Sequence, residues 1–141
     1  MPKNDAVGRR GRIDPLQPPL ARPFHQSDHN LALKTDGAVR SWGYNYHGEL
    51  GNGTSGAGTD RSTPGSVIGL ENVRSISGGA YHSLAVLESG RARAWGYNEY
   101  GQLGNGASGA AADSDVPVAV KNLTGVRNMD GGYVHTLAVA P

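Results

Sequence analysis

The stretch HSLAVLESGRARAWGYNEYGQLG at residues 82–104 repeats the pattern HNLALKTDGAVRSWGYNYHGELG, which stands 53 positions earlier at residues 29–51. Residues 29–81, laid over residues 82–134 without a gap, share 25 of 53 positions, and a further copy begins at His135. Repeats of this length are typical of solenoids, propellers and repeat arrays. The sequence therefore consists of unit 29–81, unit 82–134 and a partial unit 135–141.

Each unit predicts about four short strands. Residues 30–34 alternate polar and apolar side chains, Asp36-Gly37 predicts a tight turn because glycine readily adopts positive φ, and residues 38–42 return. Residues 64–67 and 73–76 predict two further strands, and no segment has the 3.6-residue period of a helix. Four antiparallel strands are the blade of a β-propeller. We therefore predict an all-β fold, a partial β-propeller of two four-stranded antiparallel blades plus a partial third.

Composition excludes several classes of site. The 141 residues include 13 Lys and Arg against 12 Asp and Glu, and no Cys. The near-neutral charge argues against a nucleic-acid partner, and the absence of Cys excludes disulfides and thiolate metal sites. No apolar run is long enough to cross a membrane, and the proline-containing N-terminus does not resemble a secretory signal. We expect no membrane partner and, by default, a cytoplasmic protein.

Two domains are expected along the chain. Residues 1–27 mix Pro, Arg and Gly without periodicity, which predicts a disordered or irregular N-terminal segment. Residues 28–141 contain the propeller repeats.

The motifs WGYNYHGELG (42–51) and WGYNEYGQLG (95–104), followed by Gly-Gly-x-x-His at 78–82 and 131–135, resemble the repeat of the regulator-of-chromosome-condensation family. The resemblance covers about residues 29–139. It implies a propeller, typically of seven blades, whose binding surfaces are assembled across the ring. In one branch it also implies guanine-nucleotide exchange on a small GTPase.

Positions that recur in register are interpreted as structural. The in-phase histidines begin equivalent strands of successive units, so we predict that they do not converge on a metal ion. The glycine pair before a histidine is expected to hold it at a bend, and the tryptophans are expected to pack between blades. These positions are His29, His82, His135, Trp42, Trp95, Gly78, Gly79, Gly131 and Gly132.

No cofactor site or catalytic residue is predicted. Residues 51–56 and 104–109 match G-x-G-x-x-G, but a dinucleotide site needs a helix after that loop, and none is predicted. Ser83 and Thr136 each follow a repeated histidine, yet adjacent side chains of a strand point to opposite faces. We therefore expect a protein that is not an enzyme.

The loop after each tryptophan carries the predicted partner-binding residues, because tyrosine and histidine are contact residues of protein interfaces. They are Tyr44, Tyr46, His47, Tyr97, Glu99 and Tyr100. The predicted function is a non-catalytic repeat module for protein–protein interaction through blade loops, in a fragment or short member of a propeller family; the alternative is guanine-nucleotide exchange on a small GTPase. Because two blades leave apolar faces uncovered, self-association is also predicted.

Overall fold

The computed structural model describes residues 28–141, so the predicted disordered or irregular segment 1–27 lies outside the described residues. Within residues 28–141 all the regular elements are β-strands. No helix in this range is long and apolar enough to cross a membrane. The strands are β1 (His29–Leu33), β2 (Val39–Gly43), β3 (Arg61–Ser66), β4 (Val73–Gly78), β5 (His82–Leu87), β6 (Ala92–Gly96), β7 (Ser114–Ala119), β8 (Asn128–Gly131) and β9 (Thr136–Val139).

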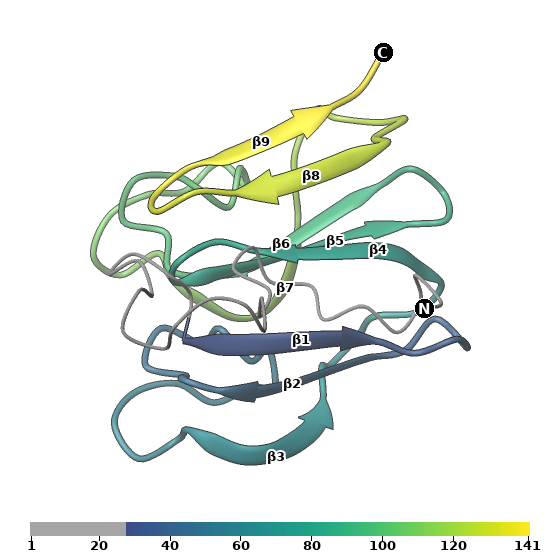
Figure 1. The fold of residues 1–141 in the computed structure, drawn as a ribbon. Coiled ribbons are helices and arrows are strands. Elements are labelled where there is room, and N and C mark those ends of the chain that lie inside the picture. The colour runs from purple at the N-terminus through teal and green to yellow at the C-terminus, as the bar shows by residue number, and fades with distance from the viewer. Residues whose placement is uncertain (1–27) are drawn as a thin grey trace, which may run out of the picture.

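These strands form three antiparallel sheets that lie one above the other (Figure 1). The first sheet has the order β1-β2-β3, the second β4-β5-β6-β7 and the third β8-β9. The prediction of an all-β partial propeller is confirmed, because each sheet stacks face to face on the next.

The division of strands among the sheets differs from the prediction of two four-stranded blades plus a partial third. The sheets have three, four and two strands, because β4 of unit 29–81 pairs forward with β5 of the following unit. Only residues 79–81 separate these two strands, so they form a hairpin in which Gly78 lies opposite Ser83. The boundary between sheets therefore falls before β4, and the sequence units and the sheets are out of phase.

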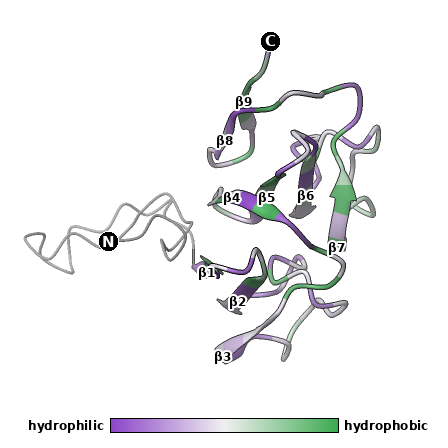
Figure 2. Ribbon diagram, turned by 90° about the vertical axis from the view of Figure 1, so that its right-hand side faces the viewer, coloured by the Kyte–Doolittle hydropathy of each residue, from purple (hydrophilic) through white to green (hydrophobic). Residues whose placement is uncertain are grey.

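Two apolar layers hold the sheets together. Between the first and second sheets, Trp95 packs with Leu31, Val39 and Val73. A second cluster, between the second and third sheets, is built around Leu84 and buries residues from β5, β6 and β8. In Figure 2 green apolar segments mark β5 and β7 of the central sheet. Burial of apolar area on both faces of the second sheet is the main stabilising contribution to the stack.

The third sheet exposes side chains that the second sheet buries. Leu137 and Val139 of β9 are 63% and 57% exposed, whereas Leu84 and Val86, their counterparts 53 positions earlier, are 0% and 1% exposed. One face of the third sheet is therefore apolar and uncovered in this chain.

Candidate functional site

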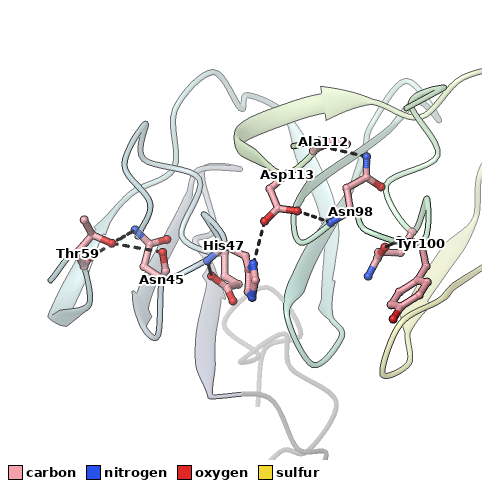
Figure 3. Close-up of polar contacts among 9 residues, drawn as sticks. Asn45, His47, Thr59, Asn98, Tyr100, Ala112 and Asp113 are labelled. Carbon is pink, nitrogen blue, oxygen red and sulfur yellow. Dashed lines mark hydrogen bonds and ion pairs between the residues drawn. The ribbon is translucent and has the colours of Figure 1, made fainter. Parts of the chain in front are cut away.

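The loops that follow β2 and β6 are held by a buried asparagine each. Asn45 Oδ1 accepts a hydrogen bond from the Leu50 amide at 2.9 Å, and its Nδ2 donates to the Thr54 carbonyl at 3.0 Å and to Thr59 Oγ1 at 3.1 Å (Figure 3). The amide of Asn45 donates to Asp60 Oδ1 at 3.0 Å. A buried polar side chain with this many partners fixes the loop around it.

Asn98 repeats the arrangement in the second sheet. Its Oδ1 accepts from the Leu103 amide at 3.0 Å, and its Nδ2 donates to the carbonyls of Ala107 at 3.1 Å and Ala112 at 3.2 Å. The Asn98 amide donates to Asp113 Oδ1 at 2.8 Å. Both loops therefore present their outer side chains from a fixed backbone.

One contact joins the two loops directly. Asp113 Oδ2 lies 2.8 Å from His47 Nδ1, so one carboxylate binds the amide of its own loop and the imidazole of the preceding sheet (Figure 3). This pair sets the position of one loop relative to the other.

All six tyrosines of the chain gather on this side of the sheets, in one series of ring contacts with His47. The ring centroids of His47 and Tyr97 are 4.3 Å apart, and Tyr81 lies 5.7 Å from His47 and 6.1 Å from Tyr97. All seven pairs are tilted or edge-to-face, the arrangement that aromatic quadrupoles favour. We call this set the tyrosine surface: Tyr44, Tyr46, His47, Tyr81, Tyr97, Tyr100 and Tyr133.

The tyrosine surface encloses an open groove. Its volume is about 430 Å³. Val134 and every residue of the tyrosine surface other than Tyr46 line it. Tyr100 and Tyr133 are 67% and 48% exposed, so large aromatic rings stand at its rim, and Tyr46, which does not line the groove, is 53% exposed beside His47. The other rings are partly buried and support them.

The structure brings together five of the six predicted partner-binding residues: Tyr44, Tyr46, His47, Tyr97 and Tyr100. Glu99 lies beside Tyr100 and is half-buried, without joining the ring contacts. Its negative charge is among the causes that raise the pKa of Tyr97, so it is near the groove.

Sequence reasoning missed Tyr81 and Tyr133. Both lie in the short links that lead into β5 and β9, but they are not repeat-equivalent, because Tyr133 corresponds to Ala80 and Tyr81 to Val134. Their contact, with centroids 5.7 Å apart, depends on neighbouring sheets. The available signal was an aromatic residue soon after each glycine pair.

Acidic side chains lie near two tyrosines of this surface. Burial raises the pKa of Tyr44, and the charge of Asp60 and, at the alkaline pH where a tyrosine ionises, that of Glu49 raise it further. Burial likewise raises the pKa of Tyr97, with added repulsion from its neighbours Tyr100, Glu99 and Asp113. No lysine or arginine of the described chain lines the groove. The site is thus aromatic, with the carboxylates of Asp60, Glu99 and Asp113 nearby.

Glu49 is a carboxyl group buried just beneath this surface. Its Oε1 accepts a hydrogen bond from the His47 amide at 2.8 Å, and its Oε2 has no hydrogen-bond partner. Burial raises the pKa of Glu49 to about 8. The side chain is therefore mainly neutral at pH 7, which is the form that a buried site without a cation favours.

The repeated histidines bond to the following sheet. Ser83 Oγ donates to the Glu49 carbonyl at 2.8 Å and lies 2.9 Å from His29 Nε2, from which it accepts because its one proton is already used. His82, Thr136 and the carbonyl of Gln102 repeat this geometry at 3.0 and 2.8 Å. The hydroxyl that follows His82 or His135 therefore bonds the histidine of the preceding unit.

The glycine pairs make room for these rings. A Cβ on Gly79 would lie 2.1 Å from His82 Cε1, and one on Gly132 would lie 2.1 Å from His135 Cε1. A Cβ on Gly131 would approach the Gly79 backbone to 2.6 Å, so this position lets β8 lie against β4. Gly78 is buried at the end of β4.

The two tryptophans occupy different environments. Trp95 is fully buried between the first two sheets, where its Nε1 donates to the Glu49 carbonyl at 2.8 Å. Trp42, its counterpart in the first sheet, is half-buried. Among residues 28–141 no group of three or more His, Asp or Glu side chains is placed to hold a metal ion.

Comparison with known proteins identifies the repeat. A model described as the regulator of chromosome condensation (RCC1) repeat matches residues 36–86 and 89–139, and a second model of that repeat matches residues 73–102. The ultraviolet-B receptor UVR8 of Arabidopsis thaliana is 36% identical over 116 residues, which cover 79% of this chain and 25% of that protein. The chain spans about a quarter of the length of this relative.

Solved structures agree on the fold. Prp20p of Saccharomyces cerevisiae, in a structure that also addresses its binding to Gsp1p and histones, superimposes with a TM-score of 0.66 at 23% identity, covering 98% of this chain and 31% of that one. Yeast RCC1 (Prp20) bound to Kap60 gives a TM-score of 0.70 at 24% identity, covering 98% and 36%. At this level of identity the likeness shows the propeller fold.

Proposed function

Because the chain belongs to the regulator of chromosome condensation (RCC1) repeat family, we propose that it is a non-catalytic protein-interaction module. It contacts its partner through the tyrosine surface. The observation that carries the proposal is the convergence of all six tyrosines on one side of the sheets. Tyrosine is enriched at the buried centres of protein interfaces, since it supplies a large contact area and a hydroxyl at low entropic cost.

The architecture supports this role. Asn45 and Asn98 hold the loops from beneath, and the pair between His47 and Asp113 joins them. A surface organised before binding loses little conformational entropy when a partner docks. The exposed rings of Tyr46 and Tyr100 are therefore available at small cost.

Site-specific photocrosslinking tests the proposal. We expect p-benzoylphenylalanine placed at Tyr100 to give a discrete protein adduct in cells that make this protein. The adduct should disappear when Tyr81→Leu is added, because Tyr81 contacts four of the other rings. The matched control carries the crosslinker at Ile68, an exposed apolar side chain outside the groove. Equal adducts from Ile68 and Tyr100 would refute the assignment of the surface.

Guanine-nucleotide exchange on a small GTPase is the alternative. It is supported by the likeness to Prp20p, whose structure was described together with its binding to Gsp1p. A chain that spans about a third of Prp20p supplies only part of such a surface. Release of a fluorescent guanine nucleotide from a small GTPase, with and without this chain, tests it; faster release that Tyr81→Leu abolishes would favour exchange over simple binding.

We also propose self-association through uncovered sheet faces. Leu137 and Val139 are exposed on the third sheet, whereas their counterparts in the second sheet are buried. In the first sheet, Trp42 is less buried than Trp95. A second copy that stacks its first sheet on the third sheet of the first copy would cover both faces.

A further inference from the structure

We infer that the groove of the tyrosine surface accepts a cationic side chain, and that its occupant is an arginine-bearing segment of a partner protein. The inference rests on the proposed function, because it names the chemistry of a partner at the same surface. It follows from the rings that line the groove and from the sign of the charges around it.

The rings suit a cation. Tyr81 lies at the centre of the groove, with the centroids of Tyr44, Tyr97 and Tyr133 between 5.7 and 6.1 Å away. Because these pairs are tilted or edge-to-face, none of these rings covers the face of another by flat stacking. A guanidinium or ammonium within about 6 Å of a tyrosine centroid is attracted to the negative ring face.

The charges around the groove also favour a cationic occupant. The carboxylates of Glu99 and Asp113 lie near enough to Tyr97 to oppose its ionisation, and Asp60 acts on Tyr44 in the same way. No lysine or arginine within residues 28–141 lines the groove, and because Asp113 is already paired with His47, Asp60 and Glu99 are the carboxylates left to meet a cation. An anionic partner would meet repulsion here, whereas a cation gains from both the rings and the carboxylates.

Arginine fits this combination better than lysine. Its planar guanidinium stacks on aromatic faces and offers paired N–H donors to a carboxylate, and it is more weakly hydrated than an ammonium. Glu99 precedes the exposed Tyr100 in the chain, is half-buried and lies near enough to Tyr97 to oppose its ionisation, so its carboxylate is the acceptor expected for such donors. The open groove of about 430 Å³ has room for a guanidinium and part of its aliphatic stem.

The test is a titration of the full chain with a fluorescein-labelled dodecapeptide of glycine and serine that contains three arginines. The matched probe has citrulline at the same three positions, which keeps the shape and removes the charge. We expect saturable binding of the arginine peptide and at least tenfold weaker binding of the citrulline peptide. Equal affinities would overturn the inference.

Variants separate the ring face from the hydroxyl. Tyr81→Leu and Tyr97→Leu should each weaken binding of the arginine peptide about three- to fivefold, whereas Tyr81→Phe should keep it within twofold because the ring remains. Ile68→Ala, outside the groove, is the control and should leave the affinity unchanged. Loss of binding in Tyr81→Phe equal to that in Tyr81→Leu would contradict recognition by the ring face.

The chain itself carries arginines at positions 9, 10 and 12, which could compete for the groove. The triple variant Arg9→Gln, Arg10→Gln, Arg12→Gln should bind the arginine peptide with unchanged affinity; tighter binding would make the chain's own segment the occupant and overturn the assignment to a partner. If neither peptide binds while the Tyr100 crosslink persists and still depends on Tyr81, only the cationic inference fails. Loss of the crosslink as well would refute the proposed function.

Discussion

Glu49 and Gln102 occupy equivalent positions of the two repeats and accept the same kind of hydrogen bond. Glu49 Oε1 receives the His47 amide at 2.8 Å, and Gln102 Oε1 receives the Tyr100 amide at 3.0 Å. In each residue the second polar atom, Glu49 Oε2 or Gln102 Nε2, is buried without a partner. A protonated glutamic acid and a glutamine are close in shape, so Glu49 acts as a glutamine as long as it keeps its proton.

The first prediction is a pH dependence of stability. Glu49 has a pKa of about 8 in the folded chain against an ordinary 4.5, so between these values the folded state holds a proton that the unfolded state has lost. The free energy of unfolding should therefore fall as pH rises through this range, by at most about 1.4 kcal/mol per pH unit from this group. Urea unfolding at pH 5, 6, 7 and 8 measures the slope.

Glu49→Gln is the matched variant. It should remove most of that slope and raise the free energy of unfolding at pH 8 by up to about 4 kcal/mol, because the buried group no longer ionises. A slope that is the same in the variant and the original chain would show that other groups cause it.

The second prediction concerns the joint between the loops. His47 and Asp113 link the loops of two neighbouring sheets through one contact of 2.8 Å that is partly open to solvent. A double-mutant cycle with His47→Ala and Asp113→Asn should give a coupling free energy of up to about 1 kcal/mol. The exposed pair of Lys34 and Asp36, 4.0 Å apart, provides a comparison cycle in which a coupling near zero is expected.

The third prediction compares the two hydroxyls that bond to histidines. Ser83 is fully buried and touches both His29 and the Glu49 carbonyl, so Ser83→Ala should lower the free energy of unfolding by about 1–3 kcal/mol. Thr136→Val removes the equivalent contacts in the third sheet, where water reaches the site, and should cost less. Chemical unfolding of both variants measures the difference, and a larger loss for Thr136→Val would contradict the repeat geometry.

The fourth prediction addresses self-association. Leu137→Asp places a charge on the uncovered face of the third sheet and should shift sedimentation velocity profiles from an associated species to a monomer, because burying an unpaired carboxylate is strongly unfavourable. Ile68→Asp, at a comparably exposed apolar side chain elsewhere, should leave the profile unchanged. An original chain that sediments as a monomer at all concentrations would refute the proposal.

The repeat pattern predicted the strands because alternation and turn glycines are local signals. The pairing of β4 with β5 could not be read in the same way, since it depends on which neighbouring strand the chain meets after Gly79. In each loop, local sequence was enough to single out the residues after the tryptophan.

The link between loops was harder to predict. Tyr81 and Tyr133 complete the tyrosine surface from positions that differ between repeats, so comparing the repeats gave no signal for them. Ser83, which bonds His29, likewise lies 54 positions along the chain in the next sheet. Only the stacking of the sheets brings these two side chains together.

Forward pairing of β4 also determines where the chain can be cut or recombined. A segment excised as residues 82–134 would carry β5 without its hairpin partner, whereas residues 73–125 contain the complete four-stranded sheet. Grafts and consensus designs based on this protein should therefore exchange modules at the connection around residues 67–72, which leaves every ladder of backbone hydrogen bonds intact.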